Sequence, residues 1–292
     1  MVKQPTHNRS SLGSIPSRRT ILILNTIMEN TSHTTRRILS WNPHQLPQSH
    51  TTTRTVLVVS GCSFTDLARD NTVPLTWPGY LAERCRFDHV IDLSHTGAGN
   101  EYISTSIINE IESMTLQQRN ECLVIVCWSG IDRHEILEYI DAPTAIPYKA
   151  IINNIFYKRK YNLPKVYKVM SENESRGEAL RSWKNILMLQ NYLENKNISF
   201  GFSFYVNVFD PPFLPRRDSG AEWPDRLDKK KIEQLRQCHW IHPHVDSLFE
   251  WCFFHDELDH DLFHPSTNGS LKWVDAVLLP GLVNMGVIDK IG

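Results

Sequence analysis

Short apolar runs alternate with longer amphipathic segments along this chain, and this alternation constrains the fold more than any other feature. The segment Thr55–Ser63, which reads TVLVVSGCS, is rich in β-branched residues and ends in small ones. It predicts a buried strand that enters a tight turn. Similar runs predict strands at His89–Ser94, Cys122–Trp128 and Ile198–Val206. Apolar residues at helical spacing predict helices over Trp77–Arg86, Asn100–Met114, Gly177–Asn197 and Thr267–Leu279.

Strands that alternate with helices in this way are typical of βαβ crossovers. We therefore expect an α/β protein, a three-layer α/β/α sandwich around a central and mainly parallel sheet. A chain of 292 residues with 41% apolar residues is long enough for one main domain, which we place at residues 55–292. Two irregular stretches within it, near 140–175 and 207–245, predict surface insertions.

Residues 1–54 differ from the rest of the chain in composition. They are rich in Ser, Thr and Arg, and Glu29 is their only acidic residue. This composition predicts a flexible basic arm that adds nothing to the core. A tether to an assembly partner, an organelle-targeting segment and an over-long start of the chain all fit it and stay open.

Charge and cysteine content exclude several classes of protein. The formal net charge is −1, which lacks the basic bias of a nucleic-acid binder. No apolar stretch reaches the roughly 20 residues that a membrane-spanning helix needs, so we expect a soluble protein without a membrane partner. The six cysteines form no CxxC pair, which predicts a reduced chain without disulfides. The compartment stays open between cytoplasm, virion and organelle.

Small and polar residues stand where the predicted strands end. These segments are Gly61–Thr65 after the first strand, Gly97–Asn100 after the second and Trp128–Arg133 after the third. Ligands bind at the carboxyl ends of parallel strands, so all three segments should face one crevice. Near the end of the chain, Asp261 precedes His264 by three residues and can reach its imidazole within one turn, as in a base and its orienting acid.

Two of these segments resemble the motifs of the SGNH, or GDSL-type, hydrolases. The family's serine lies in a Gly-Asp-Ser-x-Thr block, which Gly61-Cys62-Ser63-Phe64-Thr65 matches except at Cys62. Its acid and base lie in a late Asp-x-x-His block, which Asp261-Leu262-Phe263-His264-Pro265 matches completely. The resemblance spans roughly residues 55–282, and its helix and strand from Leu189 to Phe204 are similar to those of members found in phages and bacteria. It implies the flavodoxin-like SGNH hydrolase fold.

The resemblance also implies a role for each residue of the site. Ser63 would attack an ester carbonyl, His264 would act as base and then acid, and Asp261 would orient His264, with an acyl-serine intermediate. The family's oxyanion hole uses the serine N–H, a second-block glycine N–H and a third-block asparagine side chain. Gly97 takes the glycine position in one alignment, and Gly99 takes it after a shift of two residues.

The third block departs from the family pattern. Gly130 or Asp132 stands where the asparagine is usual, so one oxyanion donor is missing. Ser129 and Asn100 are candidate replacements. Arg133 could pair with Asp132 or hold an anionic substrate group. Trp128 could stack on a sugar ring or fill the top of the core, and we assign these last three residues to substrate binding.

These observations predict a serine esterase without a cofactor or metal. Its expected substrate is a small acyl ester, with acetyl on a carbohydrate suggested by the family alone. A catalytically weak or inactive module that binds glycans or serves a virion is the alternative. A zinc deacetylase is a third reading, because a late region is rich in ligand-type residues: Cys238, His239, His242, His244, His255, Asp256, Asp259 and His260.

Overall fold

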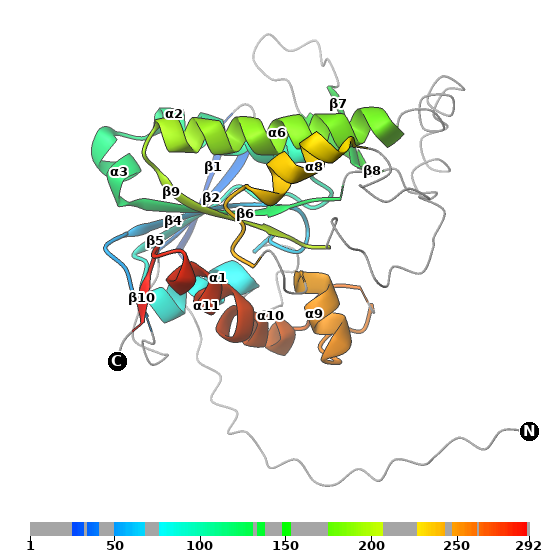
Figure 1. The fold of residues 1–292 in the computed structure, drawn as a ribbon. Coiled ribbons are helices and arrows are strands. Elements are labelled where there is room, and N and C mark those ends of the chain that lie inside the picture. Colours follow the sequence, from blue (N-terminus) through cyan, green and yellow to red (C-terminus); the bar gives the residue numbers. More distant parts are fainter. Residues whose placement is uncertain are drawn as a thin grey trace, which may run out of the picture.

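Four parallel strands form the centre of the protein in a computed structural model of the chain (Figure 1). The structure describes residues 25–31, 34–40, 50–67, 76–130, 133–137, 148–152, 175–206, 227–242, 247–261 and 263–290. Strand β4 (Val56–Ser60) pairs with β5 (His89–Asp92) on one side and with β6 (Cys122–Trp128) on the other, and β6 pairs with β9 (Ser199–Phe204). All three pairings are parallel, so the four carboxyl ends share one edge.

Helices cover both faces of this sheet and make three layers. One face carries α2 (Asn100–Ser113), α6 (Ser175–Asn195) and α8 (Lys229–Arg236), at the top of Figure 1. The other carries α1 (Trp77–Cys85), α9 (Leu248–Phe254), α10 (Thr267–Trp273) and α11 (Leu279–Asn284). Side chains of β4 alternate between the two cores, with Val58 in the first and Leu57 in the second. The predicted α/β class with a mainly parallel sheet is confirmed.

The predicted strands and helices that frame the sheet are confirmed within a few residues. The third predicted strand has the same bounds in the structure as in the sequence analysis. The last predicted helix contains a π-helical segment, η1 (Val274–Leu278), and continues beyond its predicted end as α11. Pro280 stands at the start of α11, and a proline has no N–H for the regular helical bond. The short helices α3 (Leu116–Glu121) and α9 were not predicted.

The amino-terminal segment contributes more than a flexible arm to the described fold. Strand β1 (Asn25–Thr31) pairs antiparallel with β2 (Thr34–Ser40), and β2 pairs antiparallel with β5. The sheet order is therefore β1-β2-β5-β4-β6-β9. A two-residue strand, β3 (His50–Thr51), pairs with β10 (Asp289–Lys290) near the other end of the chain. The structure thus departs from the expectation for residues 1–54, because the free edge of β5 accepts main-chain hydrogen bonds from β2.

The two predicted insertions lie largely outside the described residues. Within the first, the structure describes β8 (Tyr148–Ile152), which pairs with β7 (Arg133–Leu137); within the second it describes α8. All six cysteines are free and buried, as predicted. In the described part of the chain, no helix is both long and apolar enough to cross a membrane.

Candidate active site

Ser63 lies in a single tight turn at the carboxyl end of β4. The N–H groups of Thr65 and Asp66 both donate to the carbonyl oxygen of Cys62, at 2.9 and 3.1 Å. Cys62 and Phe64 are buried in the core on the α1 and α10 side, and they fix the turn on either side of Ser63. A Cβ at Gly61 would lie 2.2 Å from Thr65 Oγ1 and 3.0 Å from the Cys127 carbonyl oxygen, so the close approach of β6 requires glycine there.

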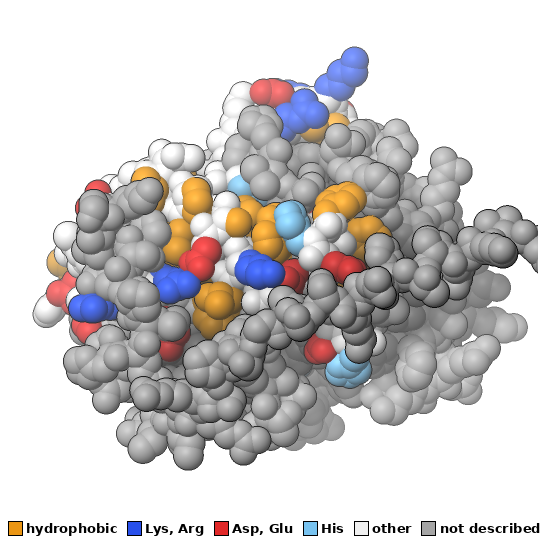
Figure 2. All heavy atoms as spheres, turned by 90° about the horizontal axis from the view of Figure 1, so that it is seen from below, with side chains coloured by type: hydrophobic (Ala, Val, Ile, Leu, Met, Phe, Trp, Pro, Cys, Tyr) orange, Lys and Arg blue, Asp and Glu red, His pale blue; other side chains and the backbone are white. Residues whose placement is uncertain are grey.

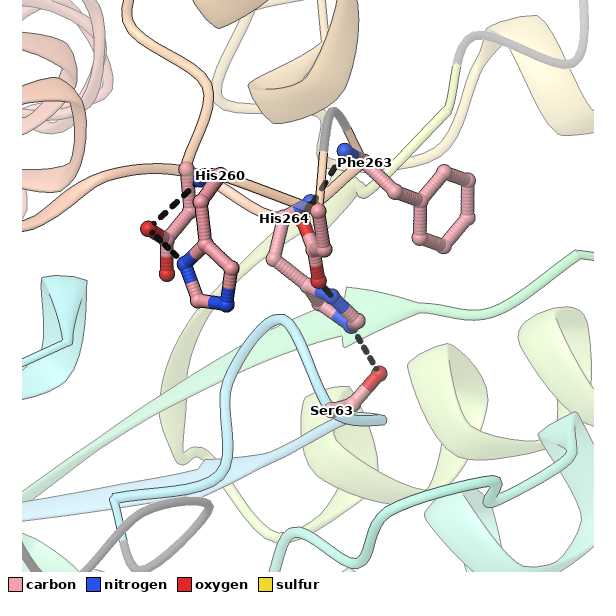
Figure 3. Close-up of polar contacts among 6 residues, drawn as sticks. Ser63, His260, Phe263 and His264 are labelled. Atoms are coloured by element: carbon pink, nitrogen blue, oxygen red, sulfur yellow. Dashed lines mark hydrogen bonds and ion pairs between the residues drawn. The ribbon is translucent and has the colours of Figure 1, made fainter.

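Three side chains predicted to act together lie in hydrogen-bond contact. His264 Nε2 is 2.9 Å from Ser63 Oγ, and His264 Nδ1 is 2.6 Å from Asp261 Oδ2. Figure 3 shows the Ser63 hydroxyl pointing at the His264 ring, while His260 lies to one side. The contact joins residues 201 positions apart in the sequence. The structure thus brings Ser63, His264 and Asp261 together in the expected order.

The carboxylate of Asp261 fixes the tautomer of His264. Partial burial acts to raise the Asp261 pKa, but hydrogen bonds from the His264 main chain, its ring and the Phe263 N–H outweigh burial and hold the pKa well below its usual range. An ionised carboxylate only accepts hydrogen bonds, so Nδ1 of the neutral ring carries the proton. Nε2 is then an acceptor, and the Ser63 hydroxyl donates to it.

A closed loop holds Asp261 and His264 in place. Ser266 N–H donates to the Glu257 carbonyl oxygen at 2.8 Å, and Asp259 N–H donates to the His264 carbonyl oxygen at 2.7 Å. The Glu257 carboxylate accepts hydrogen bonds from Ser266, which caps α10, and from Asn268 and Lys272, in the first and last turns of that helix. Burial acts to raise the Glu257 pKa, but the bonds from Lys272 and Asn268 hold it below the ordinary value. Glu257 therefore ties both ends of the loop to one helix.

A second loop is tied to the Ser63 turn by two buried carboxylates. Thr96 Oγ1 donates to Asp66 Oδ2 at 3.0 Å. Asp92 accepts from the Leu67 N–H at 3.2 Å and from the N–H and hydroxyl of Ser94. Both carboxylates are at most 4% exposed. They fix the segment before Gly97 against the turn that carries Ser63.

Of the two candidate oxyanion glycines, only Gly97 has a backbone that requires glycine. Its φ is +84°, in the left-handed region, whereas Gly99 has an extended φ of −94° and caps α2. Within the described residues, neither Ser63 N–H nor Gly97 N–H donates to a main-chain carbonyl.

The candidates for the third donor are occupied to different degrees. Asn100 Nδ2 donates to the Ser129 carbonyl oxygen at 3.1 Å and to Ser182 Oγ at 3.0 Å, and Asn100 Oδ1 accepts from the Ser129 N–H at 2.9 Å. The whole Asn100 amide therefore joins α2 to the end of β6. Ser129 Oγ is buried and has no hydrogen-bond partner among the described residues. Gly130 follows it and has no side chain to donate.

Of the three residues assigned to substrate binding, the structure describes the side chain of Trp128 alone. Trp128 is 0% exposed and packs edge-on against Phe202 in the core, so its assignment to substrate stacking is wrong. Its side chain packs into the core on the α2 and α6 side, whereas the Cys127 side chain packs into the core on the other face of the sheet, so both faces are covered at the end of β6. Asp132 lies outside the described residues. Arg133 begins β7, and its side chain also lies outside them.

A second serine–histidine contact involves strand β9, and it was not predicted from the sequence. Ser203 Oγ on β9 is 2.8 Å from His242 Nε2, and Ser203 is 1% exposed. His242 in turn packs edge-on against Trp273 of α10. Among the described residues, which exclude His244, no group of three or more His, Cys, Asp or Glu side chains is arranged to hold a metal ion.

Sequence reasoning also missed the residues that support the site. Glu257 and Asp66 stand outside the recognised blocks, and the contacts that Asp92 and Thr96 make were not predicted. Their common signal is a carboxylate or hydroxyl close to a motif in the sequence. That signal is weak because such residues are equally frequent at exposed turns.

Solved structures with a similar fold include three proteins named as lipases or lipolytic proteins. A lipase from a goat rumen metagenome is 12% identical, with a TM-score of 0.44 over 80% of this chain and 97% of that one. A GDSL-like lipase from Parabacteroides merdae is 10% identical, with a TM-score of 0.42 over 82% and 100%. A member of the lipolytic G-D-S-L family from Veillonella parvula is 9% identical, with a TM-score of 0.41 over 78% and 96%. The resemblance to phage members stays a prediction.

Sequence comparison gives a narrower result. No curated protein matches the chain. One family model matches residues 65–230, which include β5, β6 and β9 but not Ser63, Asp261 or His264. This match covers more than half of the sequence, and the chain therefore belongs to DUF6071, a family of unknown function.

Proposed function

We propose that the protein is a serine esterase in which Ser63, His264 and Asp261 form the catalytic triad. The observation that carries this proposal is the unbroken pair of hydrogen bonds, 2.6 Å from Asp261 to the ring of His264 and 2.9 Å from that ring to Ser63. A nucleophile, a base and an orienting acid in this geometry are suited to acyl transfer.

The chemistry follows from the protonation states. Ser63 Oγ attacks the ester carbonyl carbon while its proton passes to His264 Nε2. The tetrahedral intermediate then collapses, the carbon–oxygen bond to the alcohol breaks, and His264 returns the proton to the departing oxygen. Water repeats the sequence on the acyl-serine and releases the acid. Asp261 stays ionised throughout, which its low pKa favours, and stabilises the imidazolium form of His264.

The oxyanion would be held by main-chain N–H groups and one hydroxyl. The N–H groups of Ser63 and Gly97 are the first two donors. Asn100 is unsuited as the third because both of its N–H bonds serve Ser129 and Ser182. The buried Ser129 hydroxyl is the better candidate, since no described residue accepts from it. One missing donor typically costs about 2.7–4 kcal/mol of transition-state stabilisation, so this replacement would matter for the rate.

The finer description of the substrate is also a proposal. A small acyl group, acetyl in particular, on a carbohydrate was suggested by the family resemblance. Trp128, which was predicted to stack on a sugar, is buried. No described residue among those assigned to substrate binding therefore supports a carbohydrate substrate. An inactive binding or structural module is the rival function.

The test is hydrolysis of p-nitrophenyl acetate together with labelling by a fluorophosphonate. Ser63→Ala and His264→Ala should abolish turnover, and mass spectrometry should find one adduct, on Ser63. The second contact supplies matched controls, because Ser203→Ala and His242→Ala remove a serine–histidine pair of similar length. Both controls should keep turnover. Folded protein that shows neither turnover nor adduct would favour the inactive module.

A further inference from the structure

Aromatic rings form a continuous path from His264 to the surface. The ring centroids of Phe64 and His264 are 4.8 Å apart, and the Phe263 ring packs edge-on against the His264 ring with a centroid distance of 5.2 Å. The ring centroids of Phe263 and Phe249 are 5.5 Å apart, and those of the stacked Phe249 and Phe253 rings are 6.1 Å apart. We call Phe64, Phe249, Phe253 and Phe263 the aromatic ridge. Phe64 is buried, whereas Phe263 is 39% and Phe253 51% exposed, so the ridge begins at the triad and ends in solvent.

The ridge comes from three separate segments of the chain. Phe64 follows Ser63, Phe249 and Phe253 lie on α9, and Phe263 precedes His264 in its loop. Figure 2 views the molecule from the side of α9 and α10, where hydrophobic side chains form several neighbouring patches between charged ones. Exposed phenylalanine is unfavourable relative to buried phenylalanine, so a run of such rings beside the proposed nucleophile suggests a ligand surface.

The position of the ridge indicates which part of an ester would lie on it. In the proposed reaction, His264 Nε2 delivers a proton to the departing alcohol oxygen. The alcohol must therefore leave on the side of the His264 ring, and the rings of Phe64 and Phe263 pack against that same ring. Phe249, Phe253 and Phe263 belong to other segments than the oxyanion donors proposed at Ser63 and Gly97. The ridge is thus adjacent to the alcohol part of the substrate rather than to its acyl part.

We infer that the aromatic ridge binds an apolar, ring-containing alcohol, so that the substrates are small acyl esters of aryl or arylalkyl alcohols. This inference rests on the proposed esterase function. Phenylalanine offers ring faces and edges but no hydrogen-bond group, and aromatic rings pair favourably with one another in offset or edge-on geometry. A sugar would need hydrogen-bond partners for its hydroxyl groups, which the four ridge side chains lack.

The experiment compares two acetate esters whose alcohols have similar acidity, benzyl acetate and 2-methoxyethyl acetate. Both give the same acetyl-enzyme, so a difference in kcat/KM reports the alcohol alone. The wild-type protein should prefer the benzyl ester by about tenfold, the factor that 1.4 kcal/mol supplies. Phe263→Ala and Phe253→Ala should reduce this preference to about threefold or less. The main-chain bond from Phe263 to Asp261 is kept in Phe263→Ala.

Controls separate binding from folding. Leu116→Ala removes a 74% exposed apolar side chain on α3. Helix α3 leads into the amino end of β6, whereas the candidate site lies at the carboxyl ends of the strands. This variant should therefore leave the preference unchanged. Phe263→Leu keeps an apolar side chain in place but removes the ring, so it should also reduce the preference. This variant provides the test if Phe263→Ala fails to fold.

Four results would overturn the inference. Equal rates for the two esters in the wild-type protein, or an undiminished preference in both Phe263 variants, would remove the ridge from substrate binding and leave the esterase in place. A higher kcat/KM for a peracetylated sugar would assign the alcohol site to carbohydrates instead. No turnover of any ester and no fluorophosphonate adduct on Ser63 would overturn the proposed function as well.

Discussion

Gly61→Ala tests the packing on which the nucleophile turn depends. The new Cβ would lie 2.2 Å from Thr65 Oγ1, 2.8 Å from Thr65 Cβ and 3.0 Å from the Cys127 carbonyl oxygen. Rotation of the Thr65 side chain can move Oγ1 but not Cβ. The turn or strand β6 must therefore move, and ordinary contact at about 3.4 Å or more requires a displacement of roughly half an ångström to one ångström.

This displacement should lower both the free energy of unfolding and the rate of ester hydrolysis. Thr65 is fully buried, and overpacking of such a site typically costs about 1–3 kcal/mol. Thermal unfolding should then begin roughly 2–4 °C lower for each kcal/mol lost. Because Ser63 lies in the same turn, a shift of about 1 Å in its hydroxyl should slow ester hydrolysis by about 100-fold. Circular dichroism gives Tm, and p-nitrophenyl acetate gives the rate.

Two further variants sharpen the result. Gly177→Ala on α6 places a Cβ with nothing within 4 Å, and it should raise stability by about 0.5–1 kcal/mol. Gly61→Ala combined with Thr65→Gly removes the two shortest contacts and should recover part of the loss, as expected for coupled neighbours. A Gly61→Ala protein with the wild-type Tm and rate would refute the packing on which this reasoning depends.

Two other predictions concern Asp261 and Ser129. The folded-state pKa of Asp261 lies below the unfolded value of about 3.9, so its contribution to stability is complete above that pH and is lost as the pH falls toward the folded pKa. The wild-type protein should therefore lose more Tm between pH 5 and pH 3 than Asp261→Asn, and equal losses would contradict this. Ser129→Ala should slow acylation by about 100- to 1,000-fold while Tm changes little, because its hydroxyl has no partner among the described residues. An unchanged rate would exclude the hydroxyl from the oxyanion hole.

The buried strands could be predicted from sequence because their signal is local. A parallel strand covered on both faces needs an unbroken apolar run, and the run in β6 has the same bounds as the strand. Strand β2 gives no such signal. It reads TTRRILS, and its place in the sheet depends on main-chain pairing with β5, whose residues lie far along the chain. Edge pairing of this kind leaves little trace in local composition.

The contacts of the candidate site also differ in how far the sequence predicts them. The contact between Asp261 and His264 follows from their three-residue spacing, which is a local property. The contact between His264 and Ser63 was expected only through the family resemblance, because 201 positions separate the two residues. Trp128 shows the limit of such reasoning. A residue at a strand end faces either the ligand or the core according to strand register, and this sequence alone left that choice open.

The end of β6 shows how the proposed triad would combine with the proposed oxyanion hole, in which a hydroxyl replaces an amide. An asparagine amide has only two N–H bonds, and those of Asn100 both stabilise the junction of α2, α6 and β6. That junction fixes the Ser129 main chain, whose own N–H is taken by Asn100 Oδ1. The Ser129 hydroxyl is then the polar side-chain group of these two residues that has no partner among the described residues, and it follows the strand that pairs with β4. An esterase built this way would depend on a rigid hydroxyl where an amide is usual, so its rate should depend more directly on the Ser129 hydroxyl than on the Asn100 amide.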